Sequence, residues 1–145
     1  ARTASRTSIA SRVAMLSFSN FGSNPHPSAR KARRAVEIVR ARAPELAIDG
    51  EMQADTAVMA SVLQESYPWT RLGGPANVLI FPELNSANTA YKLIWRLAGA
   101  EAIGPVLLGM ARPVHVLQRG VEVSDIVNMA AICVVDAQEY EARKG

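Results

Sequence analysis

Apolar residues in this chain form short uninterrupted runs that alternate with longer stretches of helical spacing. Residues 12–18 (RVAMLSF) and 77–81 (NVLIF) are such runs, and they predict strands that are buried on both faces of a sheet. Between them, residues 28–43 place apolar side chains at helical intervals. Ser28 can cap this predicted helix at its start, and Pro44 ends it.

The same alternation continues to the end of the chain. Strands that alternate with helices, and that are apolar throughout, indicate a mainly parallel sheet covered on both faces. We therefore predict an α/β fold, a three-layer α/β/α sandwich with a mainly parallel sheet. Further strands are expected at 46–49 and 103–108, a second apolar run at 114–117, and further helices at 54–64, at 85–97 and from 123 into the 130s or as far as 142.

Length and composition restrict the class of protein. A chain of 145 residues with 49% hydrophobic and 20% charged residues is expected to form one domain with a real core. No apolar run reaches the roughly 20 residues that cross a bilayer, so no membrane partner is expected. The single cysteine, Cys133, excludes a disulfide framework, and we interpret it as a buried small apolar residue of a cytoplasmic protein.

The net charge of +3 is mild. Much of the excess lies on the predicted helix 28–43, whose inward positions are apolar, so its cations are interpreted as a solvated face. Aromatic residues do not interleave with these cations, and no nucleic-acid partner is expected. The positive charge of the chain could equally well attract an anionic small ligand. The cations are Arg30, Lys31, Arg33, Arg34, Arg40 and Arg42.

The loop after the first predicted strand, SFSNFGS at 17–23, combines hydroxyls, a glycine and free backbone N–H groups at a strand-to-helix crossing. Such a loop can form a nest for an oxyanion. The same residue types are also common in ordinary turns, and both interpretations stay open on the pattern alone. The candidate ligand-binding residues of this loop are Ser17, Ser19, Asn20, Gly22 and Ser23.

Three acidic residues stand within the segment DGEMQAD at 49–55. They could bind a divalent cation, but the spacing of a calcium-binding loop is missing, and Asp55 can instead favour the start of the next helix. His26 lies in a loop flanked by prolines and His115 in an apolar run, and neither belongs to a pattern of metal ligands. No metal site is expected in this chain.

Polar residues in the second half of the chain supply further candidates. Asn85 or Asn88 can hydrogen-bond a ligand at the edge of the sheet, or can be an ordinary N-cap. Gln118, Arg119 and Asp125 flank a predicted strand-to-helix corner, where anionic ligands bind in α/β proteins. On the pattern alone, Arg119 and Asp125 could equally form an exposed ion pair worth under about 1 kcal/mol.

Four separated segments, in the right order, resemble phosphate acetyltransferases. The resemblance implies an isocitrate/isopropylmalate dehydrogenase-like fold, with 13–145 as the C-terminal part of that family's domain and 1–12 as a linker or truncated junction. SFSNFGS and PVHVL look closer to the same domain in large bacterial NADP-dependent malic enzymes. The four segments are the loop at 17–23, DGE-x-Q-x-D at 49–55, GGPANVLIFPELNSAN at 73–88, and GPVLLGMARPVHVLQRG with DIV in 101–127.

The resemblance also implies roles for individual residues. The family's reactive Ser-Arg pair falls on Gln118-Arg119, and its acidic residue falls on Asp125, so the serine is replaced by glutamine. In an acyltransferase, Asp125 would act as general base on the coenzyme A thiol and Arg119 would bind phosphate. Acetyl-CoA is the implied ligand, held by the loop 17–23, Asn88, Gln118 and Arg119.

Three functions follow from this resemblance. The first is a regulatory domain that senses acetyl-CoA in an NADP-dependent malic enzyme, whose N-terminal part would decarboxylate malate to pyruvate and hold the NADP and a divalent metal. The second is a phosphate acetyltransferase, which exchanges an acetyl group between coenzyme A and phosphate. The third is a structural oligomerisation module. A homodimer or higher homo-oligomer is expected, because this part of the family's domain carries much of its subunit contact.

Overall fold

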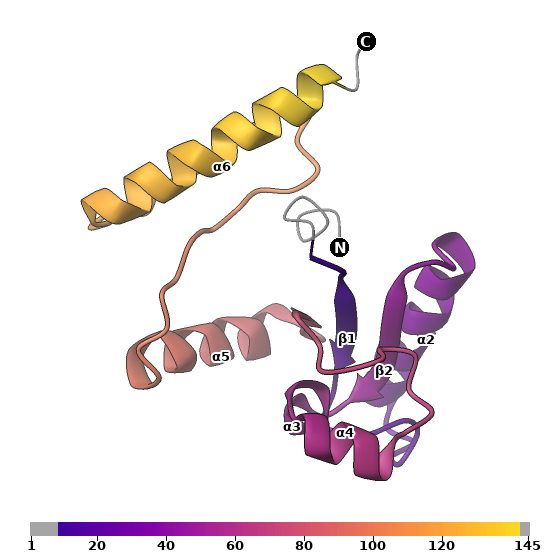
Figure 1. The fold of residues 1–145 in the computed structure, drawn as a ribbon. Helices are drawn as coiled ribbons and strands as arrows, with labels where there is room; N and C mark the ends of the chain where they lie inside the picture. Colours follow the sequence, from indigo (N-terminus) through magenta and orange to yellow (C-terminus); the bar gives the residue numbers. More distant parts are fainter. Residues whose placement is uncertain (1–8, 143–145) are drawn as a thin grey trace. The chain divides into compact units, whose positions relative to one another are not determined.

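The structure of the chain is a computed structural model, which describes residues 9–142 (Figure 1). The chain divides into two compact units, Ala1–Tyr91 and Lys92–Gly145. The predicted linker at 1–12 falls largely on residues 1–8, which lie outside the described residues.

The first unit is built around a parallel sheet of three strands. Its strands are β1 (Arg12–Leu16), β2 (Ala47–Met52) and β3 (Val78–Ile80), in the order β2-β1-β3. Both β2 and β3 pair with β1 in parallel, so the predicted α/β fold and parallel sheet are confirmed for this unit. The apolar run that predicted a strand at 12–18 forms the central strand.

The residues of β1 alternate between two apolar clusters, one on each face of the sheet. Val13 and Met15 pack in a cluster with Ala32 and Val36 of α2 (Pro27–Arg42). Successive side chains of a strand point to opposite faces. The intervening residues of β1 therefore belong to the second cluster, on the face covered by α3 (Ala54–Val58). That cluster contains Ala14, Leu16, Met52, Ala57 and Leu72.

Two local details of the first unit differ from the sequence prediction. The first helix starts one residue earlier than predicted, with Pro27 in its first turn, and its N-cap is His26 instead of Ser28. The His26 Nδ1 atom accepts a hydrogen bond from the Ser28 N–H at 3.2 Å, as a capping side chain does. The second strand is longer than the predicted 46–49 and continues through Gly50 and Glu51 to Met52.

The predicted single helix at 54–64 is wrong, because this segment forms two short helices. They are α3 and α4 (Ala60–Ser66), and Met59 between them has an extended backbone with φ −97° and ψ 114°. The Ala57 carbonyl, which a continuous helix would pair with the N–H four residues later, accepts a hydrogen bond at 2.8 Å from the Ala76 N–H. A contact from a distant segment therefore interrupts the helix.

Helix α5 (Leu84–Leu97) agrees with the prediction at 85–97, although its cap is not the predicted residue. The Glu83 carboxylate accepts hydrogen bonds from the Asn85 N–H and the Ser86 N–H, each at 2.7 Å. Glu83 therefore caps this helix through its side chain. The interpretation of Asn85 or Asn88 as the N-cap is wrong, because both lie within the helix.

The second unit contains the helix α6 (Val123–Ala142), which reaches the predicted end at 142. The predicted strand at 103–108 and the strand-like run at 114–117 are wrong, because residues 98–122 form neither helix nor strand. A strand needs a neighbour that takes up its backbone hydrogen bonds. The three strands of the described sheet all lie in the first unit, so these apolar runs have no strand to pair with in their own unit.

None of the helices within residues 9–142 is both long enough and apolar enough to cross a membrane.

Candidate functional site

The candidate loop lies at the carboxyl end of the central strand. Residues 17–24, here called the serine loop, connect β1 to the segment that leads into α2. The Ser17 N–H donates to the Met52 carbonyl at 2.8 Å, which fixes the start of the loop to the end of β2. Ligands of open parallel sheets bind outside the carboxyl ends of the strands, so the loop is in the position that this rule favours.

The buried carboxylate of Glu51 accepts hydrogen bonds from the serine loop. Glu51 of β2 has no exposed surface, and its Oε1 accepts hydrogen bonds from Ser19 Oγ at 3.0 Å and from the Gly22 N–H at 2.8 Å. Arg33 of α2 completes the arrangement, because its Nε donates to Oε2 at 2.9 Å and its Nη2 to Oε1 at 3.1 Å. Such a forked pair with a carboxylate is among the stronger protein hydrogen-bonding arrangements.

The surroundings of Glu51 favour its charged form. Burial alone would raise the pKa of this carboxyl, but the hydrogen bonds from Arg33, Gly22 and Ser19 outweigh it and hold the pKa below its usual value. The same ion pair raises the pKa of Arg33, because its guanidinium is hydrogen-bonded to Glu51 and attracted by its charge. The carboxylate and guanidinium are therefore charged at neutral pH.

The serine loop also binds itself. Ser19 Oγ lies 3.1 Å from Ser23 Oγ and accepts from the Asn24 N–H at 3.1 Å, and Asn20 Oδ1 accepts from the Gln53 N–H at 2.7 Å. Each backbone N–H group from 19 to 24 donates to an acceptor inside the chain. The N–H groups that suggested an anion nest are thus engaged within the chain, and the Ser19 hydroxyl is buried and engaged as well, so Ser19 and Gly22 shape the loop instead of facing a ligand. Ligand contact by the more accessible side chains of Ser17, Asn20 and Ser23 stays a prediction.

A second buried carboxylate on β2 holds a different loop. Asp49 accepts hydrogen bonds from Thr70 Oγ1 at 2.9 Å and from the Arg71 N–H at 2.8 Å, and it is paired with Arg40 of α2. Asp49 and Glu51, both on β2, thus accept hydrogen bonds from two different loops. Arg40 is the counterion of Asp49. The interpretation of the cations of this helix as a solvated face is wrong for Arg33 and Arg40.

The acidic segment shows no sign of a cation site. Asp49 and Glu51 are bound to arginines and N–H groups, and Asp55 lies in the first turn of α3, as the alternative interpretation expected. Within residues 9–142, no three side chains of the metal-binding types gather closely enough to hold a metal ion. The carboxylates of Asp49 and Glu51 are therefore engaged in hydrogen bonds and ion pairs within the first unit.

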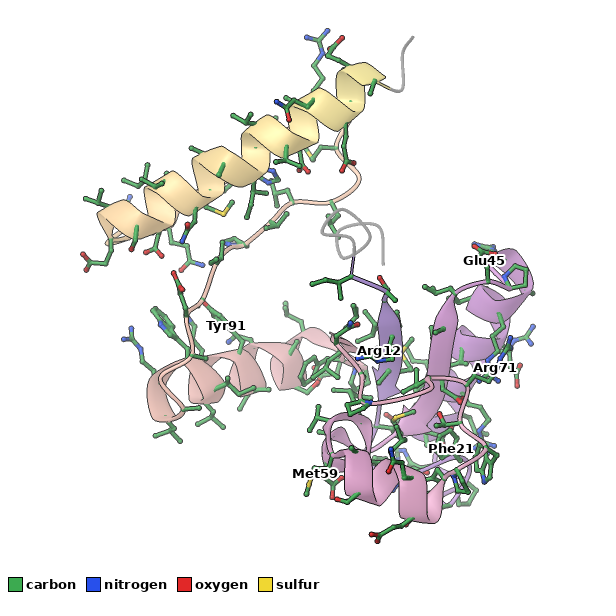
Figure 2. The ribbon with its side chains drawn as sticks, viewed as in Figure 1. Arg12, Phe21, Glu45, Met59, Arg71 and Tyr91 are labelled. Carbon is green, nitrogen blue, oxygen red and sulfur yellow. The ribbon has the colours of Figure 1, made fainter. Side chains whose placement is uncertain are left out.

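Aromatic side chains join the two loops. The Phe21 ring of the serine loop lies 4.8 Å from the Tyr67 ring and 4.5 Å from the Trp69 ring, measured between centroids. Figure 2 labels Phe21 beside the segment that carries Arg71, so the two loops can be followed there. Trp69 is 61% exposed, so part of this aromatic cluster is accessible to solvent. A hollow of about 220 Å³ lies nearby, between α4 and the 67–75 loop, and contains none of the predicted ligand residues.

The remaining predicted residues lie on α5 and in the second unit. Asn88 is exposed on α5, and Gln118 and Arg119 are exposed in the segment before α6. Asp125 Oδ2 accepts from the Glu122 N–H at 2.9 Å, while the Asp125 N–H donates to the Glu122 carbonyl at 3.1 Å. Asp125 therefore helps to cap α6, and the described structure shows no bond between it and Arg119. The predicted strand-to-helix corner is a junction between irregular chain and helix.

A histidine–carboxylate pair in the second unit was only half anticipated. His115 Nε2 lies 2.9 Å from Asp136 Oδ2 of α6, and His115 Nδ1 accepts from the Leu107 N–H at 3.4 Å. Both side chains are largely buried, so His115 finds its hydrogen-bond partners inside the second unit. Asp136 was missed, although an acid within the apolar stretch of this helix is the signal that could have revealed it.

Comparison with known proteins places the chain in a family. The family description "Phosphate acetyl/butaryl transferase" matches residues 1–134. The chain is 48% identical over 140 residues to the NADP-dependent malic enzyme of Escherichia coli, covering 95% of this chain and 18% of that protein. It is 47% identical over 131 residues to the phosphate acetyltransferase of Acetivibrio thermocellus, covering 90% of this chain and 40% of that protein.

A solved structure shows the same similarity in three dimensions. The crystal structure of a phosphotransacetylase from Streptococcus pyogenes matches with a TM-score of 0.89 and 40% identity, covering 95% of this chain and 42% of that chain. The chain thus spans about two fifths of the length of this structure, and about a fifth of the malic enzyme.

Proposed function

The chain belongs to the phosphate acetyl/butaryl transferase family, and on that premise we propose that it is an acetyl-CoA-binding module that regulates an enzyme without turning the ligand over. The enzyme would be an NADP-dependent malic enzyme, in which NADP and a divalent metal belong to a separate N-terminal part. The similarity to the Escherichia coli malic enzyme, which extends over 140 residues, supports this parent.

The residue that carries the proposal is Gln118. It stands where the resemblance to phosphate acetyltransferases expects a serine, directly before Arg119. A glutamine amide can donate a hydrogen bond, but its shape and reach differ from those of a serine hydroxyl. Because a donor that no longer reaches a transition state typically lowers a rate by about a hundredfold or more, we expect the exchange to weaken catalysis. Binding needs no such donor, and the long amide of glutamine can still hydrogen-bond a ligand. Asp125, the family's acid, has a structural role in capping α6 that requires no catalysis.

Each unit, taken by itself, offers groups that suit this ligand. Side chains of the serine loop and of α5 offer hydroxyls and amides, and Arg119 offers a cation to the phosphates of coenzyme A. The chain's net charge of +3 favours the approach of this anionic ligand. Regulation requires a coupling of only about 1–3 kcal/mol between ligand and enzyme. The proposed contacts are Ser17, Asn20, Ser23, Asn88, Gln118 and Arg119, while Ser19 and Gly22 shape the loop.

The proposed assembly is a homodimer or a higher homo-oligomer. Large apolar side chains of the second half of the chain are exposed, among them Leu97 at 81%, Leu108 at 71% and Val123 at 75%. Exposed apolar side chains of this extent support burial against another surface.

A second candidate function is phosphate acetyl transfer. It is favoured by the phosphate acetyltransferases that match at 43–49% identity and by the retention of Arg119 and Asp125. In that case Asp125 would take the proton of the coenzyme A thiol and Arg119 would hold phosphate. In the described part of the chain, only one oxygen of Asp125, Oδ2, is engaged in the cap of α6, and the second oxygen would be the one to accept this proton.

The two candidates differ in turnover. We expect the chain, incubated with acetyl-CoA and phosphate, to form no acetyl phosphate above background, both alone and within the complete polypeptide. Acetyl phosphate formation that disappears in the Asp125→Asn variant would instead support the acyltransferase. If the complete polypeptide neither binds acetyl-CoA nor turns it over, the domain is a structural oligomerisation module.

A further inference from the structure

We infer that Glu51 and Arg33 are positioning residues, which hold the serine loop in the one backbone conformation that presents its ligand contacts. The inference rests on the proposed function only in that it takes acetyl-CoA as the ligand of this loop. Neither residue is among the proposed ligand contacts. Glu51 has no exposed surface, so any effect it has on a ligand passes through the loop.

The serine loop contains two successive residues with positive φ. Phe21 has φ +45° and Gly22 has φ +90°. A bulky L residue rarely adopts a positive φ, and such a conformation persists only where the surroundings impose it. The Phe21 N–H donates to the Glu51 carbonyl at 2.7 Å, and the Gly22 N–H donates to the Glu51 carboxylate at 2.8 Å. One residue therefore binds both N–H groups of the left-handed pair.

Arg33 fixes the carboxylate that makes this possible. Its guanidinium bonds both carboxylate oxygens of Glu51, which sets the plane of the carboxylate. The guanidinium also lies against Gly22, since a Cβ atom placed there would be 3.2 Å from Arg33 Nη2. Position 22 thus combines a positive φ with a close approach, and glycine meets both requirements.

The same carboxylate controls the hydroxyls of the loop. Ser19 Oγ donates to Glu51 Oε1 at 3.0 Å, and it also contacts Ser23 Oγ and the Asn24 N–H. A change at Glu51 therefore releases Ser19 and Gly22 directly and Ser23 through Ser19. Ser19 and Gly22 shape the backbone of the loop, and Ser23 is one of its proposed ligand contacts.

The test compares a loop variant with a variant that destabilises the fold elsewhere. Glu51→Gln keeps the size of the side chain but removes its charge. Val36→Ala removes two buried methyl groups from the apolar cluster beneath α2, and this cluster contains no residue of the serine loop. Arg33→Lys keeps a cation without the fork, and it serves as the second variant if Glu51→Gln does not fold, because Arg33 is partly exposed.

Two measurements on the full chain read out the result, at a temperature where thermal unfolding shows every variant to be folded. Calorimetric titration with acetyl-CoA is expected to show affinity lowered at least tenfold by Glu51→Gln or Arg33→Lys, and unchanged by Val36→Ala. The second measurement is acrylamide quenching of Trp69 in a Trp95→Phe background, since the Phe21 ring packs on Trp69. Quenching should increase in the two loop variants and stay unchanged in Val36→Ala.

The inference is overturned if the loop variants match Val36→Ala in quenching, or if they bind acetyl-CoA as tightly as the original chain. A chain that fails to bind acetyl-CoA contradicts the proposed function alone. In that case the quenching of Trp69 still decides whether Glu51 and Arg33 hold the loop.

Discussion

Glu51 has no exposed surface, and Arg33 supplies the counterion of its carboxylate through two hydrogen bonds. Removal of one partner from a buried ion pair typically costs about 3–5 kcal/mol, because the other charge stays buried. The Arg33 side chain is 39% exposed, so water can partly replace it. We therefore expect Arg33→Met to lower the free energy of unfolding clearly, measured by urea denaturation, because Glu51 would stay buried without its counterion.

The matched control is Arg34→Met on the same helix. Arg34 pairs with Glu37 three residues on, at 2.7 Å, but both side chains are well exposed. An exposed pair of this kind contributes under about 1 kcal/mol, so the control should lose little stability. Equal losses in the two variants would contradict the role given to burial of Glu51.

The lowered pKa of Glu51 predicts how this stability depends on pH. A carboxyl with a pKa lower in the folded than in the unfolded state stabilises the protein fully above its usual value of 4.5, and this contribution is lost as the pH falls through the folded pKa. We expect the stability difference between the original chain and Glu51→Gln to shrink when urea denaturation is repeated at about pH 3 instead of about pH 6. A difference that is constant or grows toward low pH would show that the charge of Glu51 does not stabilise the fold.

The pairing of β1 with β2 depends on a glycine. The register between these strands shifts after Met15, where Gly50 with φ +128° is its partner. A Cβ atom at position 50 would lie 2.6 Å from the Met15 carbonyl oxygen, a backbone atom that cannot move without separating the strands. Gly50→Ala is therefore expected to lower the free energy of unfolding by at least about 2 kcal/mol, measured by urea denaturation.

Gly73→Ala is the control for the backbone conformation alone. Gly73 also has a positive φ, +66°, but a Cβ atom there would meet nothing within 4 Å. The left-handed conformation by itself costs about 1–2 kcal/mol for a residue with a side chain. If Gly73→Ala is as destabilising as Gly50→Ala, the close approach of the two strands is not the cause.

The elements that local pattern predicted best are those with an uninterrupted apolar run or a long stretch of helical spacing. The strands at 12–16 and 78–80 and the helices α2, α5 and α6 follow from apolar runs and helical spacing. The break at Met59 could not be predicted, because the Ala76 N–H that causes it comes from a segment far along the chain. The apolar runs at 103–108 and 114–117 have strand-like composition but no strand partner in their own unit.

The candidate site was predicted in the same uneven way. The loop at 17–23 was found from its residue types, and the structure places it at the carboxyl end of the central strand. Arg33 was assigned to solvent, because charges on the outer face of an amphipathic helix usually are solvated. Its partner Glu51 is 18 residues away on β2, and only the folded sheet brings the two side chains together.

Taken across the molecule, the residues with chemistry fall into two units. The serine loop and its carboxylate belong to the first, and Gln118, Arg119 and Asp125 belong to the second. The chain spans about two fifths of the length of the phosphate acetyltransferase and of the solved phosphotransacetylase that it matches. A module of this kind can bind a ligand with the groups it has, whereas transfer of an acetyl group needs a complete constellation of acid, base and oxyanion donors.

The most direct test is one calorimetric titration of the chain with acetyl-CoA in the presence of phosphate, with the titrated sample assayed for acetyl phosphate. The account predicts a saturable binding isotherm together with acetyl-CoA that is recovered unchanged. Acetyl phosphate in the sample, or an isotherm without binding heat, would contradict a module that binds acetyl-CoA without turning it over.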